Sequence, residues 1–401
     1  MIYSFQQKPV PTKEPLAAVL LRGGYPREAL AALLHEDIGN PTTLANMGVC
    51  WRLLGELKIA ESCYRDALAK AVRHDILWNY GVLLEDLGLF HQAMQAFEGS
   101  LKLNPNSQGA AYRLVTSRWR LSAGLPGDEN LWEQARIGTW YDPIPGLPPL
   151  PLSDLPTEAR ILVTREGGMG DLFWLLPFVQ ELRDAGNYVA VVPWDSQRDL
   201  VIEQGFPVPE LREGIMTVDP KDFDFHLPIM SCVPRLLREP PKARKPYIQA
   251  PPPISPRAKF IGVAWSAAEA GVEFGVRSIP VEAFASLERW RVHKPVLALS
   301  LEKAPDWMVQ TKLKNWRDTA SALAMCELVI SADTAVAHLA GAMGIPTWIL
   351  LPKGSDWKWF TGLTTPWYSS ALLFRNARTP KADRSEWAPF IEEVLGMEAN
   401  P

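Results

Sequence analysis

One short stretch of the sequence places a carboxylate just after a predicted strand. Asp171 follows the glycine-rich turn 166–170, which itself follows the apolar run 161–163. The apolar spacing beyond it predicts a helix from Leu172, and 188–192 reads as the next strand. Sheets built from such units bind ligands at the carboxyl ends of their strands. Asp171 therefore either caps the helix or acts as a general base on an acceptor hydroxyl, in a loop formed by Gly168, Met169 and Gly170.

A second stretch combines an aspartate, a threonine and a histidine at the start of another predicted helix. Asp333 and Thr334 lie between an apolar, strand-like run and a helix predicted over 335–343. With Ala335 they present hydroxyl and backbone N–H groups at a helix N-terminus, which suits an anion such as a diphosphate. His338 lies on the helix face that the same cleft would reach. The alternative is a capped helix with a histidine in the core.

The first third of the chain contains an internal repeat. Two glycines, an alanine and an aromatic residue return 33 positions later, at Gly48, Gly55, Ala60 and Tyr64 and then at Gly81, Gly88, Ala93 and Phe97. Such a period is typical of paired-helix repeats. The small residues permit close helix crossings, and the aromatic residue fills a groove towards the next repeat. Gly24 and Ala29 mark an earlier partial copy, which Pro41 closes, and 108–137 still reads as helical.

This segment resembles the tetratricopeptide repeats, whose pattern is met by Gly81, Leu84, Ala93, Phe97 and Pro105. We expect about two good repeats with degenerate flanks, close to the minimum of about three for an independently stable stack. The resemblance implies a concave surface that binds a peptide or a partner protein. The alternative is a helical extension that only packs on the next domain.

The remainder of the chain carries a sharper resemblance. Gly170, Asp171 and Pro177 match the GD-x5-P element of the heptosyltransferase-like glycosyltransferases, and 333–346 matches their motif D-T-A-x-x-H-L-A-G-A-x-G-x-P. The resemblance implies two Rossmann-like lobes of the GT-B fold, with Asp171 as the catalytic base on the acceptor side. It also implies a nucleotide-sugar site on the second lobe, made of Ser266, Arg277, Asp333, Thr334, Ala335 and His338.

Three further segments bear on this resemblance. His226 belongs to a segment, 224–234, that is similar to one in repeat-bearing relatives, and it either lines the cleft or is structural. The segment 356–359 resembles their closing segment, with aromatic residues that either stack on a ligand or pack. The loop 266–270 reads Ser-Ala-Ala-Glu-Ala where relatives carry glycine with a histidine or aspartate nearby. This departure indicates a changed donor or a lost activity.

The predicted fold class combines α-helical repeats with an α/β unit. Proline clusters at 143–156 and 246–256 mark linkers, because proline stops helices and central strands. The predicted parts are a helical repeat domain, a proline-rich linker, an acceptor-side lobe and a nucleotide-sugar lobe, at 1–140, 141–157, 158–250 and 251–401. In the last lobe we expect helices at about 281–290 and over 319–326.

Composition narrows the classes of function. The net charge of −4 argues against a general nucleic-acid binder. No apolar run of about 18 residues predicts a membrane span, and the first residues lack a secretory signal pattern. The four cysteines form no CxxC pair, so we predict neither a metal site nor a disulfide framework. Free thiols favour the cytoplasm.

These features predict an inverting, metal-independent glycosyltransferase that uses a nucleotide sugar, needs no other cofactor and acts on a protein or glycan hydroxyl. The prediction requires room for a pyrophosphate at the turn that begins at Asp333. A scaffold protein with a degenerate transferase unit is the alternative from another class, favoured by the altered loop and the short repeat array. A sugar epimerase of similar fold is a weaker third, since the second acidic or histidine set that it needs is not seen in the sequence.

Overall fold

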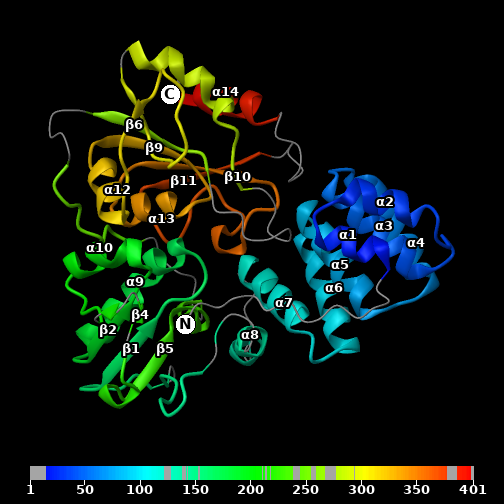
Figure 1. Ribbon diagram of the computed structural model, residues 1–401, viewed down its shortest axis with the longest axis horizontal. Helices are drawn as coiled ribbons and strands as arrows, with labels where there is room; N and C mark the ends of the chain where they lie inside the picture. Colours follow the sequence, from blue (N-terminus) through cyan, green and yellow to red (C-terminus); the bar gives the residue numbers. More distant parts are fainter. Residues whose placement is uncertain are drawn as a thin grey trace.

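The computed structural model shows a helical module beside two stacked α/β lobes (Figure 1). In Figure 1 the repeat helices are blue to cyan, the first lobe is green, and the second lobe is yellow to red. The structure describes residues 15–121, 128–137, 141, 143–151, 154–209, 211–212, 215–216, 218–237, 244–253, 259–266, 277–292, 294–376 and 386–398.

The helical module consists of successive helical hairpins. Each hairpin packs on the next, and the last one also contacts both lobes. The two sequence repeats form the second and third hairpins, and the flanking copies form the first and fourth, as predicted. The helices are α1 (Leu16–Arg22), α2 (Pro26–Leu33), α3 (Pro41–Leu53), α4 (Leu57–Lys70), α5 (His74–Asp86), α6 (Phe90–Leu103), α7 (Gln108–Arg120) and α8 (Asp128–Arg136).

An aromatic ring lies in a notch left by glycine in each central hairpin. A Cβ placed on Gly48 would lie 2.9 Å from the Tyr64 ring, and one on Gly81 would lie 2.6 Å from the Phe97 ring. Both rings are fully buried. The aromatic residue thus fills the crossing within its own hairpin, whereas the sequence predicted a groove towards the next repeat. Tyr64 also reaches the next hairpin, where its ring centroid lies 6.0 Å from that of Tyr80.

The first lobe is a parallel three-stranded sheet in the order β2-β1-β5. One face packs against α9 through Ile161 and Val163, and the opposite face, with Leu162, is covered by Leu147 and its neighbours. The elements are β1 (Arg160–Thr164), α9 (Met169–Asp184), β2 (Tyr188–Val192), η1 (Asp195–Gln197), α10 (Arg198–Glu203), β3 (Leu211–Arg212), β4 (Ile215–Met216), η2 (Pro220–Asp222), β5 (Phe225–Pro228), η3 (Ile229–Cys232) and α11 (Val233–Leu236).

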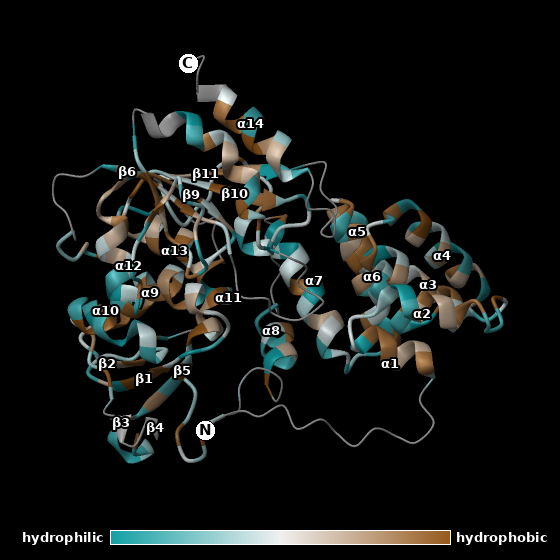
Figure 2. Ribbon diagram, turned by 45° about the horizontal axis from the view of Figure 1, so that its top comes forward, coloured by the Kyte–Doolittle hydropathy of each residue, from teal (hydrophilic) through white to brown (hydrophobic). Residues whose placement is uncertain are grey.

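The second lobe is a parallel six-stranded sheet in the order β11-β10-β9-β6-β7-β8, with helices on both faces. Figure 2 shows its hydrophobic strands between α13 and α14. Val329 and Ile349 face the core shared with α9 and α13, whereas Ile330 and Leu350 face α14. The elements are β6 (Phe260–Ala264), η5 (Val281–Val292), β7 (Val296–Ala298), β8 (Val309–Gln310), α12 (Trp316–Leu323), β9 (Cys326–Ala332), α13 (Ala335–Ala342), β10 (Thr347–Pro352), η6 (Trp357–Trp359), β11 (Ala371–Asn376) and α14 (Trp387–Glu398).

Three element predictions need correction. The helix expected over 319–326 is α12, which ends at Leu323, and Cys326 already belongs to β9 because the chain there pairs with Phe260. The helix expected at 281–290 is the 3-10 helix η5. The helix expected from Leu172 begins earlier, at Met169, so Asp171 lies in its first turn. Of the altered loop 266–270, only Ser266 lies within the described residues.

An aromatic cluster joins the three parts of the molecule. Trp119 and Trp132 of the last hairpin lie 4.9 Å apart between ring centroids, and Trp357 of the second lobe lies 5.4 Å from Trp119. Trp174 of α9 lies 6.2 Å from Trp357, and the indole N–H of Trp132 donates to the carbonyl oxygen of Met230. The repeat module is therefore packed into the core of the two α/β lobes. Among the helices that the structure describes, none is long and apolar enough to cross a bilayer.

The glycine notch gives a first prediction. Gly81→Ala places a methyl group against the buried Phe97 ring, and we expect the free energy of unfolding to fall by about 1–3 kcal/mol through overpacking. Urea unfolding of the full chain, followed by circular dichroism, measures the change. Gly99→Ala is the control, because its Cβ meets only the tip of Leu77, at 3.3 Å, and alanine is the better helix former. Equal stability of the two variants would contradict this packing.

Candidate active site between the two lobes

The side chain of Asp171, in the first turn of α9, points back to the N-terminal end of its own helix. Gly167 has a φ of +71°, and a Cβ there would lie 2.5 Å from Oδ2 of Asp171, so this position requires glycine. The N–H of Gly168 donates to the same oxygen at 2.7 Å. Asp171 therefore caps α9, which is the first of the two roles that the sequence left open.

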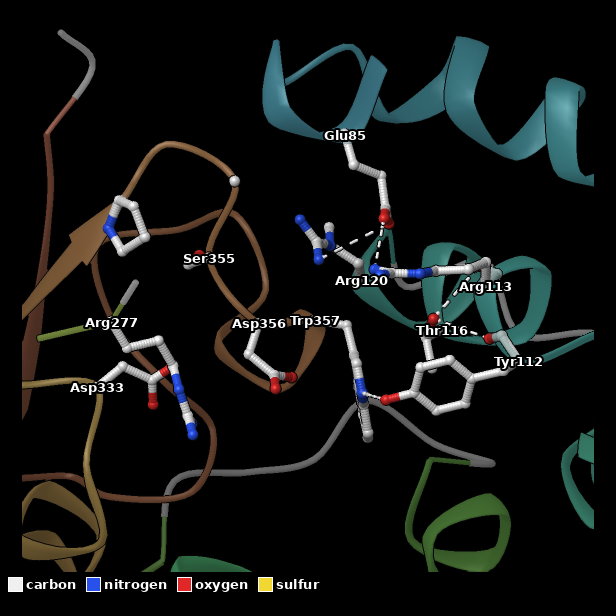
Figure 3. A pocket seen from close by; sticks show the side chains of 12 residues that line it. Glu85, Tyr112, Arg113, Thr116, Arg120, Arg277, Asp333, Ser355, Asp356 and Trp357 are labelled. Carbon is white, nitrogen blue, oxygen red and sulfur yellow. Dashed lines mark hydrogen bonds and ion pairs between the residues drawn. The ribbon is translucent and has the colours of Figure 1, made fainter. Parts of the chain in front are cut away.

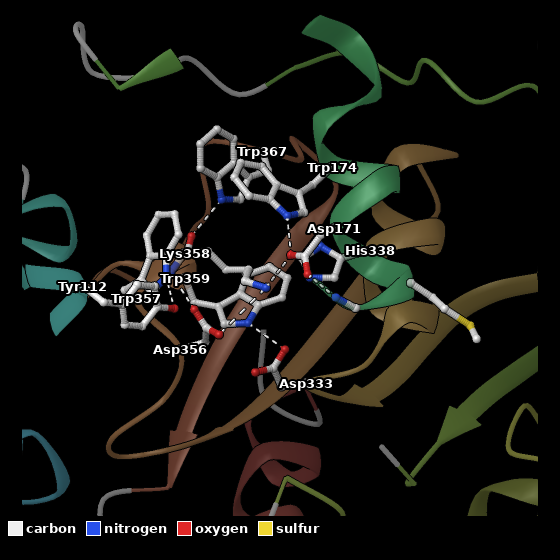
Figure 4. Close-up of polar contacts among 12 residues, drawn as sticks. Tyr112, Asp171, Trp174, Asp333, His338, Asp356, Trp357, Lys358, Trp359 and Trp367 are labelled. Carbon is white, nitrogen blue, oxygen red and sulfur yellow. Dashed lines mark hydrogen bonds and ion pairs between the residues drawn. The ribbon is translucent and has the colours of Figure 1, made fainter. Parts of the chain in front are cut away.

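The other carboxylate oxygen of Asp171 accepts two further hydrogen bonds. The indole N–H of Trp174 and the ammonium of Lys358 both donate to Oδ1, each at 2.9 Å (Figure 4). Asp171 is only 8% exposed. Burial by itself raises its pKa, but Lys358 and the hydrogen bonds outweigh this effect and lower the pKa below its usual value. Asp171 is thus a buried, charged carboxylate.

On the second lobe, the start of α13 is capped by its own threonine. Oγ1 of Thr334 accepts from the N–H groups of Val336 at 3.2 Å and Ala337 at 3.4 Å. Asp333, just before it, is buried, and its Oδ1 accepts from the indole N–H of Trp359 at 2.9 Å. Burial raises the pKa of Asp333, against the opposing charge of Arg277. Ala335 is the first helical residue.

His338 lies one turn into α13, with its ring enclosed by aromatic groups. It stacks on Trp359 with ring centroids 4.6 Å apart and planes 15° from parallel. Its Nδ1 lies 2.8 Å from the hydroxyl of Tyr368. Burial lowers its pKa well below the usual value, and the nearby Lys358 adds to this effect. The imidazole is therefore neutral near pH 7.

The two lobes meet at these helix starts. A Cβ on Gly170 would lie 2.6 Å from Cδ2 of His338 and 3.3 Å from Cα of Ala335, so glycine lets α9 and α13 touch. Figure 4 shows Asp171 and His338 on facing elements. They adjoin at a packed interface, and the space beside them is filled by Lys358 and Trp359 of η6.

The other predicted site residues are placed differently. Ser266, at the end of β6, is half-buried and its N–H donates to Oγ of Ser300 at 3.3 Å. Arg277 lines a small cavity together with Asp333. Met169 is 38% exposed, and its sulfur accepts from the indole N–H of Trp316 at 3.2 Å, which bridges the lobes at the outer edge of the interface.

His226 is not brought to the site. It pairs with Leu162 across β5 and β1, so it points to the sheet face opposite α9. Its Nδ1 lies 2.8 Å from the carbonyl oxygen of Leu147, and it lines a separate cavity of about 450 Å³ beside α8. This histidine joins the linker to the first lobe.

Lys358 and Trp174 are site residues that sequence reasoning missed. The segment 356–359 had been noted for its aromatic residues, but its lysine was not assigned a role. The available signal was a cation between two tryptophans, a combination that burial makes costly unless the cation is paired. In the part of the chain that the structure covers, no group of three or more His, Cys, Asp or Glu side chains is placed to hold a metal ion.

Comparisons with known proteins found solved structures that are similar to part of the chain. No protein-family model and no curated protein matches it. The heptosyltransferase WaaC of E. coli, solved with ADP-2-deoxy-2-fluoro heptose, is similar over 60% of this chain and 99% of its own, with a TM-score of 0.41 and 12% identity. The iron-containing dodecameric glycosyltransferase TibC of enterotoxigenic E. coli covers 60% of this chain and 77% of its own, with a TM-score of 0.40 and 13% identity.

Helical repeat proteins are similar to a smaller part of the chain. The pilF protein of Pseudomonas aeruginosa covers 30% of this chain with a TM-score of 0.28 and 23% identity, and the match spans 57% of pilF. YrrB, described as a tetratricopeptide-repeat protein with an unusual peptide-binding site, covers 30% of this chain and 70% of its own, with a TM-score of 0.24 and 20% identity. The chain itself consists of successive helical hairpins followed by two lobes with parallel sheets.

The buried ion pair gives the second prediction. Lys358→Gln leaves the Asp171 carboxylate buried without its cation, and we expect the free energy of unfolding to fall by about 3–5 kcal/mol. Combining it with Asp171→Asn should recover a large part of that loss, because no uncompensated charge then remains. Urea unfolding followed by tryptophan fluorescence measures both changes.

Lys353→Gln, an exposed lysine of the same connection, is the control and should change stability by less than about 0.5 kcal/mol. The pH dependence adds a second readout. The pKa of Asp171 is lower in the folded state than in the unfolded state. Its ionised form therefore adds fully to the free energy of unfolding above the unfolded pKa of about 3.9, and this stabilisation is lost as the pH falls through the folded pKa. In the Lys358→Gln variant, burial raises the pKa of Asp171, so ionisation of Asp171 destabilises the fold and stability falls as the pH rises. A double variant no more stable than Lys358→Gln would rule out the pair as described.

Proposed function

We propose that the protein transfers a sugar from a nucleotide-sugar donor to an acceptor hydroxyl at the interface of its two lobes. One observation carries the proposal: Asp171 at the start of α9 and the motif from Asp333 to His338 at the start of α13 meet at one place, with Gly170 in contact with His338. A base on one lobe and an anion-binding helix start on the other are the two parts that such a transfer needs.

The proposed chemistry is inverting and independent of a metal ion. The acceptor oxygen attacks the anomeric carbon, the bond from that carbon to the diphosphate oxygen breaks, and the hydroxyl proton passes to Asp171. Arg277, Lys358 and the N-terminus of α13 supply positive potential for the departing diphosphate. No other cofactor enters this proposal.

The described arrangement is a closed one. The cavity beside Asp333 and Arg277 has a volume of about 40 Å³, whereas small-molecule pockets hold roughly 300–1,000 Å³. Trp359 occupies the space over Asp333 and His338 where the donor would lie. The proposal therefore includes displacement of the segment 356–359 when a donor binds, a movement of the kind that loops make in many enzymes.

Such a displacement would also change the base. While Lys358 contacts Asp171, the pKa of that carboxyl stays low and its basicity is weak. When Lys358 turns to a bound diphosphate, burial becomes the dominant effect on Asp171 and raises its pKa. Donor binding would thus convert a structural ion pair into a stronger proton acceptor.

We propose a protein or peptide as the acceptor, held by the repeat module, and the cytoplasm as the location. The aromatic cluster supports the first part, because it fixes the repeats beside the lobe interface. The four unpaired thiols of Cys50, Cys63, Cys232 and Cys326 support a reducing compartment.

The filled interface favours a second candidate, a scaffold whose transferase unit no longer binds a donor. In that case Lys358 and Trp359 are permanent core residues and the repeat surface alone is functional. The two candidates differ in one measurable property, the binding of nucleotides by the full chain.

The third prediction concerns the base. Asp171→Asn should lower the rate of nucleoside diphosphate release from a panel of nucleotide sugars by at least about 100-fold, because the amide cannot accept the proton. Binding of the same nucleotides, measured by calorimetry, should persist. Asp184→Asn, exposed at the other end of α9, is the matched control and should leave the rate unchanged. Equal rates in both variants would remove Asp171 as the base, and no nucleotide binding by the wild-type chain would favour the scaffold.

The fourth prediction concerns the closing segment. Trp359→Phe keeps an aromatic side chain but removes the indole N–H that donates to Asp333, so displacement of the segment becomes easier by about 1 kcal/mol. We expect nucleotide affinity to rise roughly fivefold. Trp78→Phe, the same exchange in α5 and away from this segment, is the control without this effect. Weaker binding by Trp359→Phe would mean that this indole holds the donor instead of excluding it.

A further inference from the structure

A small cavity lies where the repeat module meets the second lobe (Figure 3). Its repeat-side wall comes from α5 and α7 and includes Glu85, Arg113 and Arg120, and its lobe-side wall includes Arg277 and the connection after β10. The contact between these walls is close, since a Cβ on Gly354 would lie 3.1 Å from the carbonyl oxygen of Glu85. The volume of about 40 Å³ would hold about three waters or one small oxyanion.

Arg120 lines this cavity with unused hydrogen-bond donors. The residue is 5% exposed, and its Nε and Nη1 have no hydrogen-bond partner. Its Nη2 lies 3.9 Å from Glu85, too far for a hydrogen bond, and its guanidinium lies over the Phe90 ring at 4.4 Å. A buried guanidinium with unmatched donors is costly, and a ligand that brings acceptor oxygens removes that cost.

The carboxylates around the cavity already have other partners. Glu85 accepts from Arg113 at 2.8 Å and from Ser117 at 3.3 Å. Asp356 lies 3.8 Å from Lys358, and Asp333 accepts from Trp359. On the repeat side, two arginines share one carboxylate, so positive charge is in excess there.

We propose that this cavity binds a tetrahedral oxyanion, a phosphate group, and that Arg120 of the repeat module is its principal ligand. Arg277 faces the same cavity from the other wall, so the bound group joins the two modules (Figure 3). Arginine suits this role because its planar donors match the oxygens of phosphate. The phosphate comes either from the medium or from a bound nucleotide, and only the second source depends on the proposed transferase function.

The experiment is calorimetric titration of the full chain with inorganic phosphate, at an ionic strength held constant with chloride. We expect saturable binding by the wild type and at least tenfold weaker binding by Arg120→Gln, with Arg120→Lys in between because it keeps the charge but loses the planar donors. Arg118→Gln is the matched control, because Arg118 lies on the same helix but pairs with Asp128 and Glu98 away from the cavity. Circular dichroism verifies that each variant is folded.

A second titration series identifies the source of the phosphate. If the group belongs to a nucleotide, ADP, GDP or UDP will compete with inorganic phosphate, and Arg120→Gln will weaken that nucleotide as well. If it is free phosphate, the two ligands will bind together. Asp171→Asn separates the phosphate site from the proposed transfer reaction, because it should lower the rate of transfer but leave phosphate binding intact. The absence of saturable phosphate binding by the wild type, or full binding by Arg120→Gln, would show that the cavity holds only water and would overturn the proposal.

Discussion

The lobe interface depends on one buried ion pair, Lys358 with Asp171. An ammonium and a carboxylate removed from water are stable only if they contact each other and their remaining hydrogen bonds are satisfied. Asp171 meets this condition through Gly168, Trp174 and Lys358, and it fixes the start of α9 while doing so. Because Lys358 belongs to the second lobe, the same contact sets how the two lobes sit. Gly170 completes the arrangement, since any side chain there would keep α9 away from α13.

The aromatic cluster extends this constraint to the repeat module. The segment that carries Lys358 also carries Trp357, whose ring packs on Trp119 of α7 and on Trp174 of α9. The indole N–H of Trp357 also lies 3.3 Å from the hydroxyl of Tyr112, again on α7. Movement of this segment would therefore change contacts in both lobes and in the last hairpin of the repeats. Binding of a ligand at the lobe interface and the position of the repeat module are therefore linked through the segment 356–359.

Sequence patterns predicted the parts of this arrangement that are local. The glycine turn before Asp171 and the Thr334 cap of α13 follow from backbone conformation and from short-range hydrogen bonds, which depend on a few neighbouring residues. The sequence predicted the glycine and aromatic residues of the repeats, and Tyr64 does reach the next hairpin at Tyr80, but the packing of the ring on Gly48 within one hairpin was not predicted. The role of Lys358 was not predictable in this way, because its partner lies 187 positions earlier and only the packed lobes bring the two together. The sequence left two roles open for His226 for a related reason, since the register of β5 against β1 decides which sheet face it occupies.

The closed interface and a donor-binding function are connected by a single quantity, the free energy of displacing the segment 356–359. A ligand that binds only the open form has its affinity reduced by the fraction of molecules that are open. Each 1.4 kcal/mol of displacement energy therefore weakens binding tenfold. The displaced form loses the Lys358–Asp171 contact and the Trp359–Asp333 hydrogen bond, but a bound diphosphate would offer Lys358 and Arg277 a new anion. In an enzyme, exchanging these internal contacts for contacts with a diphosphate would be favourable, whereas in a scaffold it would not. The chemistry of the ligand therefore decides between the two functions more than the shape of the interface does.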